Sequence, residues 1–184
     1  NPYIDRRCRI FELSGRLHAS DTDYFSACRT SAETALSDIL GGLAAQSAFS
    51  LPWLRNMMHN LKHHYTARPD FILPKKRVLI TAAGPGLEAG IQEIRKKANT
   101  FWILAVDTSL GCLLSHGITP DAVLSIDCQY ISTNHFMHEL PSLTTVFLDI
   151  ASHPAISARC NNVYYVGSMH PFVTLLCKDD DPFP

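Results

Sequence analysis

The chain has 184 residues, of which 46% are hydrophobic and 18% are charged, proportions that exclude a disordered protein and favour a globular one. Its net charge is −1, from 16 Lys and Arg against 17 Asp and Glu, so we expect no chain-wide basic surface for nucleic acid. No apolar run reaches the roughly 18 residues that a membrane span requires, so we expect no membrane span.

The length suits one domain or a domain with an appendage, and both ends of the sequence indicate a fragment of a larger protein. The first residues contain neither an initiator Met nor the apolar core of a secretory signal, and the last residues resemble a loop. The cysteines show neither a C-x-x-C pair nor metal-ligand spacing, which favours buried thiols in a reducing cytoplasm. They are Cys8, Cys28, Cys112, Cys128, Cys160 and Cys177.

Residues 1–75 are predicted to form a mainly helical appendage. A first helix is expected from Thr30, where a capping box precedes apolar residues at helical spacing. The glycine pair at 41–42 weakens the end of this helix. A second helix is expected after Ser50, with Pro52 tolerated in its first turn. Its apolar stripe would consist of Leu54, Met57, Met58, Leu61 and Tyr65.

From residue 76 onward the pattern alternates between apolar strands and amphipathic helices. The strands are expected at 77–83, 101–106, 122–126, 144–148 and 162–166, and the helices at 87–98, 108–116 and 133–139. The first strand is a continuous apolar run, typical of a strand buried on both faces. Gly117 stands where a helix end favours a positive φ. This alternation predicts an α/β domain over 76–184, with a Rossmann-like parallel sheet and helices on both faces.

Polar residues follow the predicted strands where such sheets bind ligands. A glycine turn, Gly84-Pro85-Gly86, follows the first strand, and its backbone together with the next helix's N-terminus suits a phosphate. Asp107, Asp127 and Asp149 follow the next three strands. Each aspartate can also be an ordinary helix cap. Asp107 lies about 20 residues beyond the turn, as a ribose-binding acid does in dinucleotide folds, but the third glycine of that motif is absent.

Histidines and basic residues provide further candidates. A metal ion suits the pairs His59 with His63 and His135 with His138, although neither pair has a third ligand in register, and His153 or His170 suits an acid or base after a strand. Ordinary loop positions are the simpler interpretation for all of them. The basic runs at 75–77 and 95–97 either attract an anion or form a solvated rim.

Three motifs in this order resemble the DUF115 or MptE-like family: LITAAGPGL at 79–87, AVDTSL at 105–110 and HGITPDAVLSID at 116–127. That family contains the bacterial motility accessory factors, or Maf-type proteins, and the archaeal 6-hydroxymethyl-dihydropterin diphosphokinases. The resemblance implies a Maf-like glycosyltransferase that uses a CMP-activated nonulosonate sugar, a nucleotide-sugar, and modifies Ser or Thr of flagellin. It implies no cofactor other than this CMP-sugar donor. It also implies that the nucleotide is bound by Gly84, Pro85, Gly86, Asp107, Thr108 and Asp127.

Within this resemblance, Asp127 is our first candidate for the catalytic general base, because it is central on the sheet edge. The alternative is a diphosphokinase that uses ATP, with Asp107, Asp127 and Asp149 around Mg²⁺. A third interpretation is a non-catalytic nucleotide-binding or flagellar accessory module. It is favoured by Gly86, which stands where the family has a Ser.

Overall fold

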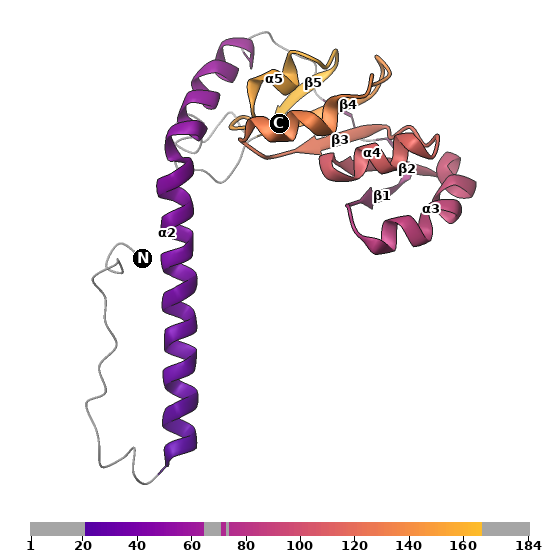
Figure 1. Cartoon of the computed structure of the whole chain (residues 1–184). Coiled ribbons are helices and arrows are strands. Elements are labelled where there is room, and N and C mark those ends of the chain that lie inside the picture. The colour runs from indigo at the N-terminus through magenta and orange to yellow at the C-terminus, as the bar shows by residue number, and fades with distance from the viewer. Residues whose placement is uncertain (1–20, 65–70, 73, 167–184) are drawn as a thin grey trace. The chain divides into compact units, whose positions relative to one another are not determined.

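The structure, a computed structural model, describes residues 21–64, 71–72 and 74–166 (Figure 1). The chain divides into two compact units, Asn1–Ser50 and Leu51–Pro184. The candidate residue His170 and the side chain of His63 lie outside the described part. No helix among the residues described combines the length and the apolarity that crossing a membrane requires.

The N-terminal helical segment is one helix, α2 (Thr22–His64), so the prediction of two helices is wrong. The helix begins eight residues before the expected capping box, because Asp21 caps it: its Oδ1 accepts a hydrogen bond from the backbone amide of Tyr24 at 3.1 Å. Each glycine costs a helix about 1 kcal/mol and a proline about 3 kcal/mol. Pro52 lies inside the helix, so the surrounding residues outweigh these costs.

The part of α2 that belongs to the second unit buries a different stripe from the predicted one. Met57 is buried as expected, but its buried neighbours are the amides Asn56 and Asn60. Leu54 and Met58, which we expected to face inward, are 40% and 53% exposed. The buried face is therefore rotated toward two polar side chains, and their hydrogen bonds, described below, explain why.

A five-stranded sheet forms the centre of the second unit, and all of its neighbouring strands are parallel. The strands lie in sequence order and are β1 (Arg77–Thr81), β2 (Phe101–Val106), β3 (Ala122–Ser125), β4 (Thr145–Asp149) and β5 (Val163–Val166) (Figure 1). Between them lie α3 (Pro85–Lys97), the 3-10 helix η1 (Ala98–Thr100), α4 (Asp107–Ser115), the 3-10 helix η2 (Tyr130–Phe136) and α5 (Pro154–Ser157). The predicted parallel α/β fold is confirmed.

The two faces of this sheet are covered differently in the described part of the chain. On one face, α3, α4, η2 and α5 contribute to a single apolar cluster with the fully buried Ala105, Val123 and Val146 of the central strands. On the other face, Phe71 packs its ring against aromatic rings of β2, β4 and β5, with centroids 4.9–5.9 Å apart. Helical coverage of this second face stays a prediction.

The first strand, β1, is at an edge of the described sheet and pairs there with β2 alone. Its side chains Val78 and Ile80 are 43% and 66% exposed, so the expectation of burial on both faces is wrong within the described residues. A continuous apolar run indicates which side chains can be buried, but the strand order decides which of them are.

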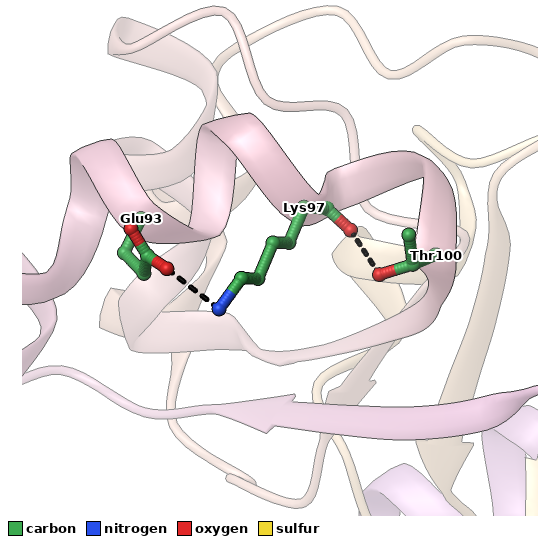
Figure 2. A network of polar contacts seen from close by, with 3 residues as sticks. All are labelled: Glu93, Lys97 and Thr100. Carbon is green, nitrogen blue, oxygen red and sulfur yellow. Dashed lines mark hydrogen bonds and ion pairs between the residues drawn. The ribbon is translucent and has the colours of Figure 1, made fainter.

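The connections at the ends of α4 and α3 follow local sequence signals. Gly117 has φ 71°, and its amide donates to the carbonyl of Leu114 at 3.0 Å, so the predicted helix stop is confirmed. At the end of α3, Lys97 pairs with Glu93 at 2.6 Å, and the Thr100 hydroxyl donates to the carbonyl of Lys97 at 2.7 Å (Figure 2). The chain then enters β2.

Candidate functional site

Parallel strands place their carboxyl ends at one edge of a sheet, so the four predicted polar segments share that edge. We call residues 84–86, 107–108, 127–129 and 149–153 the strand-end rim. Because neighbouring strands lie about 4.8 Å apart, the ends of β1 and β4 are separated by roughly 15 Å. A nucleotide with its attached group can span such a distance, so the rim is the candidate site.

The glycine turn leads from β1 into the N-terminus of α3. Gly84 is the residue before the helix, and no side chain among those described caps this end. A Cβ added to Gly84 or Gly86 would meet no heavy atom within 4 Å, so the turn faces open space. The helix dipole favours an anion here. The carboxylate of Glu88, in the first turn of α3, also interacts favourably with that dipole. The same carboxylate repels a second negative charge.

Neither basic run lies close enough to the glycine turn to bind an anion there. Residues 95–97 lie in the last turn of α3, and a helix of 13 residues separates them from the glycine turn by about 20 Å. Residues 75–77 precede or begin β1, at the opposite edge of the sheet from the rim. Both basic runs therefore fit the simpler interpretation, in which their side chains are solvated at the surface and bind no anion. The exposed ion pair of Lys97 with Glu93 illustrates this.

Asp107 ties the ends of two strands together. Its carboxylate is 6% exposed and accepts one hydrogen bond from the Thr108 amide at 2.6 Å and one from the Ser125 hydroxyl at 2.5 Å. Ser109, two residues later, lies with its hydroxyl 3.1 Å from that of Thr81 at the end of β1. The ends of β1, β2 and β3 are thus linked by buried polar contacts, and ribose binding by Asp107 stays a prediction.

The other two rim aspartates each close their own loop. Asp127 is half-buried and accepts hydrogen bonds from the Gln129 amide at 3.0 Å and from the Ser132 hydroxyl. Asp149 is 8% exposed and accepts from the Ala151 amide at 2.7 Å. These bonds explain the Asp type at strand ends without a ligand. The general-base role of Asp127 therefore stays a prediction.

The carboxylates do not form a preformed metal site. Among the residues that the structure describes, no three His, Cys, Asp or Glu side chains are grouped closely enough to hold a metal ion. The set Asp107, Asp127 and Asp149, proposed for the diphosphokinase alternative, is accordingly not brought together as a ligand group. An ion held there would need further ligands from its substrate.

Two asparagines that the sequence analysis missed organise the rim. The Nδ2 of Asn56 donates to the carbonyls of Cys128 at 2.9 Å and Ala151 at 3.0 Å. The Nδ2 of Asn60 donates to the carbonyls of Ile150 and Ser152, both at 2.9 Å. We call these two residues the asparagine pair. The available signal was their i, i+4 spacing on an apolar helix face, where a buried amide must find partners.

His153 follows the loop that these contacts hold, and its ring lies beside that of Tyr130. It precedes α5, and its Nδ1 accepts a hydrogen bond from the Ala155 amide at 3.2 Å. Its ring meets that of Tyr130 edge to face, with centroids 5.2 Å apart. Burial, and then the nearby charge of His59, lower the pKa of His153. The pairing of His59 with His63 stays a prediction, because the side chain of His63 lies outside the described part.

The cysteines are only partly as predicted. The four that the structure describes are free, and Cys128 is buried as expected, whereas Cys112 and Cys160 are half-buried and Cys28 is exposed. Cys28 lies on an exposed face of α2, so for this residue the expectation of burial is wrong. Burial raises the pKa of Cys160 to about 11 and, with Asp127 nearby, raises that of Cys128. Neither thiol is poised as a nucleophile.

Comparisons with known proteins agree with this architecture. A family model described as 6-hydroxymethylpterin diphosphokinase MptE-like matches residues 53–180. An uncharacterized protein of Treponema pallidum (strain Nichols) is 35% identical over 100 residues, which are 53% of this chain and 48% of that protein. A second uncharacterized protein of the same strain is 32% identical over 106 residues, 58% of this chain and 18% of that protein. This chain therefore spans about half of one relative and less than a fifth of the other.

The fold is also similar to that of a solved protein, the Maf glycosyltransferase from Magnetospirillum magneticum AMB-1. The TM-score is 0.58 at 15% sequence identity, over 72% of this chain and 22% of that one. At this identity the similarity concerns the fold alone. The family match covers most of the chain and includes the α2 stripe, the glycine turn and all three rim aspartates. The chain belongs to the MptE-like family.

Proposed function

We propose that this domain binds a nucleotide at the strand-end rim and acts as a Maf-like glycosyltransferase with a CMP-activated nonulosonate donor. The observation that carries the proposal is the glycine turn at the N-terminus of α3, which faces open space at the carboxyl edge of a parallel sheet. The fold similarity to a Maf glycosyltransferase supports the choice of reaction. The cytoplasmic location expected from the cysteines is part of this proposal.

The proposed reaction is a displacement at the anomeric carbon of the sugar. A Ser or Thr hydroxyl of the acceptor, which we propose to be flagellin, forms the new C–O bond while the bond to CMP breaks and its electron pair stays on the phosphate. Backbone amides at the glycine turn would stabilise that phosphate as its charge develops. The hydroxyl proton passes to a general base, for which Asp127 is the first candidate. Both of its oxygens already accept one hydrogen bond, so the proton must compete with these bonds.

The description of the family favours a second candidate, a pterin diphosphokinase that uses ATP and Mg²⁺. Magnesium is usually bound by one or two carboxylates together with substrate phosphates and water. One rim aspartate would suffice for this arrangement, so the absence of a three-ligand group among the described residues does not count against it. A non-catalytic nucleotide-binding module remains the third candidate, favoured by Gly86.

Thermal unfolding with different nucleotides separates these candidates. A ligand that binds only the folded state at 100 times its Kd stabilises it by about 2.7 kcal/mol. For a chain of this size, that corresponds to an increase in Tm of roughly 5–10 °C. We expect CMP and a CMP-sugar to raise the Tm by more than ATP does, with no requirement for Mg²⁺. A larger shift with ATP that depends on Mg²⁺ would favour the diphosphokinase, and no shift with either nucleotide would refute nucleotide binding.

A further inference from the structure

Tyr130 is an exposed aromatic residue beside the strand-end rim. It directly follows residues 127–129 of the rim and is the first residue of η2. Its side chain is 65% exposed, and the nearby Ile126 and Ile131 are 68% and 61% exposed. Single apolar side chains are ordinary on a protein surface. Three large ones within residues 126–131, next to a candidate site, form the kind of exposed patch that marks ligand-binding surfaces.

The Tyr130 ring is held in place by contacts with its backbone and with its ring. Its carbonyl accepts a hydrogen bond from the Thr133 hydroxyl at 2.8 Å. Its ring lies against that of His153, with centroids 5.2 Å apart and planes at 77°. His153 is itself fixed, because its Nδ1 accepts a hydrogen bond from the Ala155 amide at 3.2 Å. The Tyr130 ring is therefore oriented before a ligand binds, which lowers the entropic cost of binding one.

At least one face of the Tyr130 ring is free. In an edge-to-face pair the edge of one ring points at the face of the other, so His153 covers at most one face of Tyr130. Within the part of the chain that the structure describes, no second ring packs against Tyr130. A planar group can therefore stack on the free face. Every nucleobase has a π face suited to such stacking.

We propose that Tyr130 is the residue on which the base of the bound nucleotide stacks. This inference rests on the proposed function, which requires a nucleotide at the rim. Tyr130 lies near the ends of β3 and β4, two to three strand spacings of about 4.8 Å from the glycine turn that follows β1. An extended nucleoside monophosphate covers this distance. Its phosphate would lie at the glycine turn and its ribose over the end of β2, where Asp107 is predicted to bind it.

This placement also constrains the donor sugar. The sugar and the ribose are attached to the same phosphate, and Asp127 lies at the end of β3, on the side of the base. Asp127 can therefore act as the general base only if the sugar folds back over the ribose. Because cytosine and adenine both have a π face, Tyr130 supports the binding of a CMP-sugar and of ATP alike.

Two substitutions of Tyr130 test the stacking by isothermal titration calorimetry. Tyr130→Ala removes the ring, and Tyr130→Phe keeps the ring but removes the hydroxyl. We expect Tyr130→Ala to weaken CMP binding about 10-fold or more, the usual effect of removing one base-stacking side chain. Tyr130→Phe should bind CMP within about threefold of the unsubstituted chain. Ribose 5-phosphate has the sugar and the phosphate but no base, so both variants should bind it as the unsubstituted chain does.

Tyr24 provides the matched control. It is 60% exposed but belongs to the first unit and not to the rim, so Tyr24→Ala should leave the affinity for CMP unchanged. The Tm of Tyr130→Ala without ligand should change little, because most of this ring is exposed. In protein with labelled tyrosines, NMR should show the ring signals of Tyr130 shifting when CMP or cytidine is added, while those of Tyr24 stay in place.

The outcomes distinguish this inference from the proposed function. If CMP binds and Tyr130→Ala retains full affinity, the base lies elsewhere and nucleotide binding stands. If Tyr130→Ala weakens the binding of CMP and of ribose 5-phosphate equally, Tyr130 acts without stacking and the inference is refuted. If cytidine moves the Tyr130 signals and CMP binds no more tightly than cytidine, the stacking stands and the phosphate site at the glycine turn fails. If neither CMP nor cytidine moves these signals, the inference is wrong.

Discussion

Removing the amide of Asn60 tests whether the asparagine pair holds the rim together. Asn60 is fully buried, and its Nδ2 donates to the carbonyls of Ile150 and Ser152, while its Oδ1 accepts from the Tyr165 hydroxyl at 3.2 Å. Asn60→Ala leaves two buried carbonyls without this donor, and each unsatisfied group costs about 1–3 kcal/mol. We therefore expect the free energy of unfolding to fall by about 2–6 kcal/mol.

Urea unfolding followed by tryptophan fluorescence measures this loss, with the free energy extrapolated linearly to water. The Tm should fall by roughly 10 °C. Asn161→Ala is the control, because Asn161 is exposed and a surface substitution of this kind changes stability by within about 0.5 kcal/mol. Asn60→Asp keeps the size of the side chain but turns a carboxylate oxygen toward two carbonyls, so at neutral pH it should destabilise at least as much.

The reasoning would be refuted if Asn60→Ala and Asn161→Ala had the same free energy of unfolding. In that case the carbonyls of Ile150 and Ser152 would find other hydrogen-bond donors. The loop after β4, which carries His153, would then not be held in place by α2. A smaller loss for Asn60→Asp than for Asn60→Ala would also contradict it, because it would show that the donor atom is not required.

Further predictions concern the rim. Gly84→Val should fold with little change in Tm, because its Cβ meets open space, but should lose the CMP-induced shift; retained binding would place the phosphate elsewhere. Asp107→Asn should lower nucleotide affinity by about 1–2 kcal/mol, whereas Asp127→Asn should slow transfer about 100-fold at unchanged affinity. If both variants keep their affinity and rate, the two aspartates only hold their own loops through hydrogen bonds. His153 has a lowered pKa, so its unfolded state binds the proton first, near pH 6.5, and stability is lost as the pH falls below that value. His153→Asn should flatten the decrease in Tm between about pH 7 and 5, and an unchanged slope would contradict this.

Much of the fold follows from signals that act over a few residues. Apolar runs define β2 and β4 to within one residue, and Gly117 ends α4 with the positive φ that its position indicates. The glycine turn was correctly placed between β1 and α3. These features are predictable because backbone preference and hydrophobic periodicity are local properties of the sequence. The strand ends that define the rim were predictable for the same reason.

Only the tertiary structure decided which side chains meet at that rim. Asn56 reaches carbonyls that are 72 and 95 residues away in the sequence, and Asn60 reaches carbonyls 90 and 92 residues away, so no local pattern identifies these contacts. The exposure of Ile80 likewise depends on the strand order, because within the described residues β1 is an edge strand that pairs with β2. A sequence shows where a polar group occurs, whereas its hydrogen-bond partner and its burial are set by packing between distant elements. For this chain, the sequence by itself determined the parallel α/β architecture and the location of the candidate site, and the fold alone determined which residues organise it.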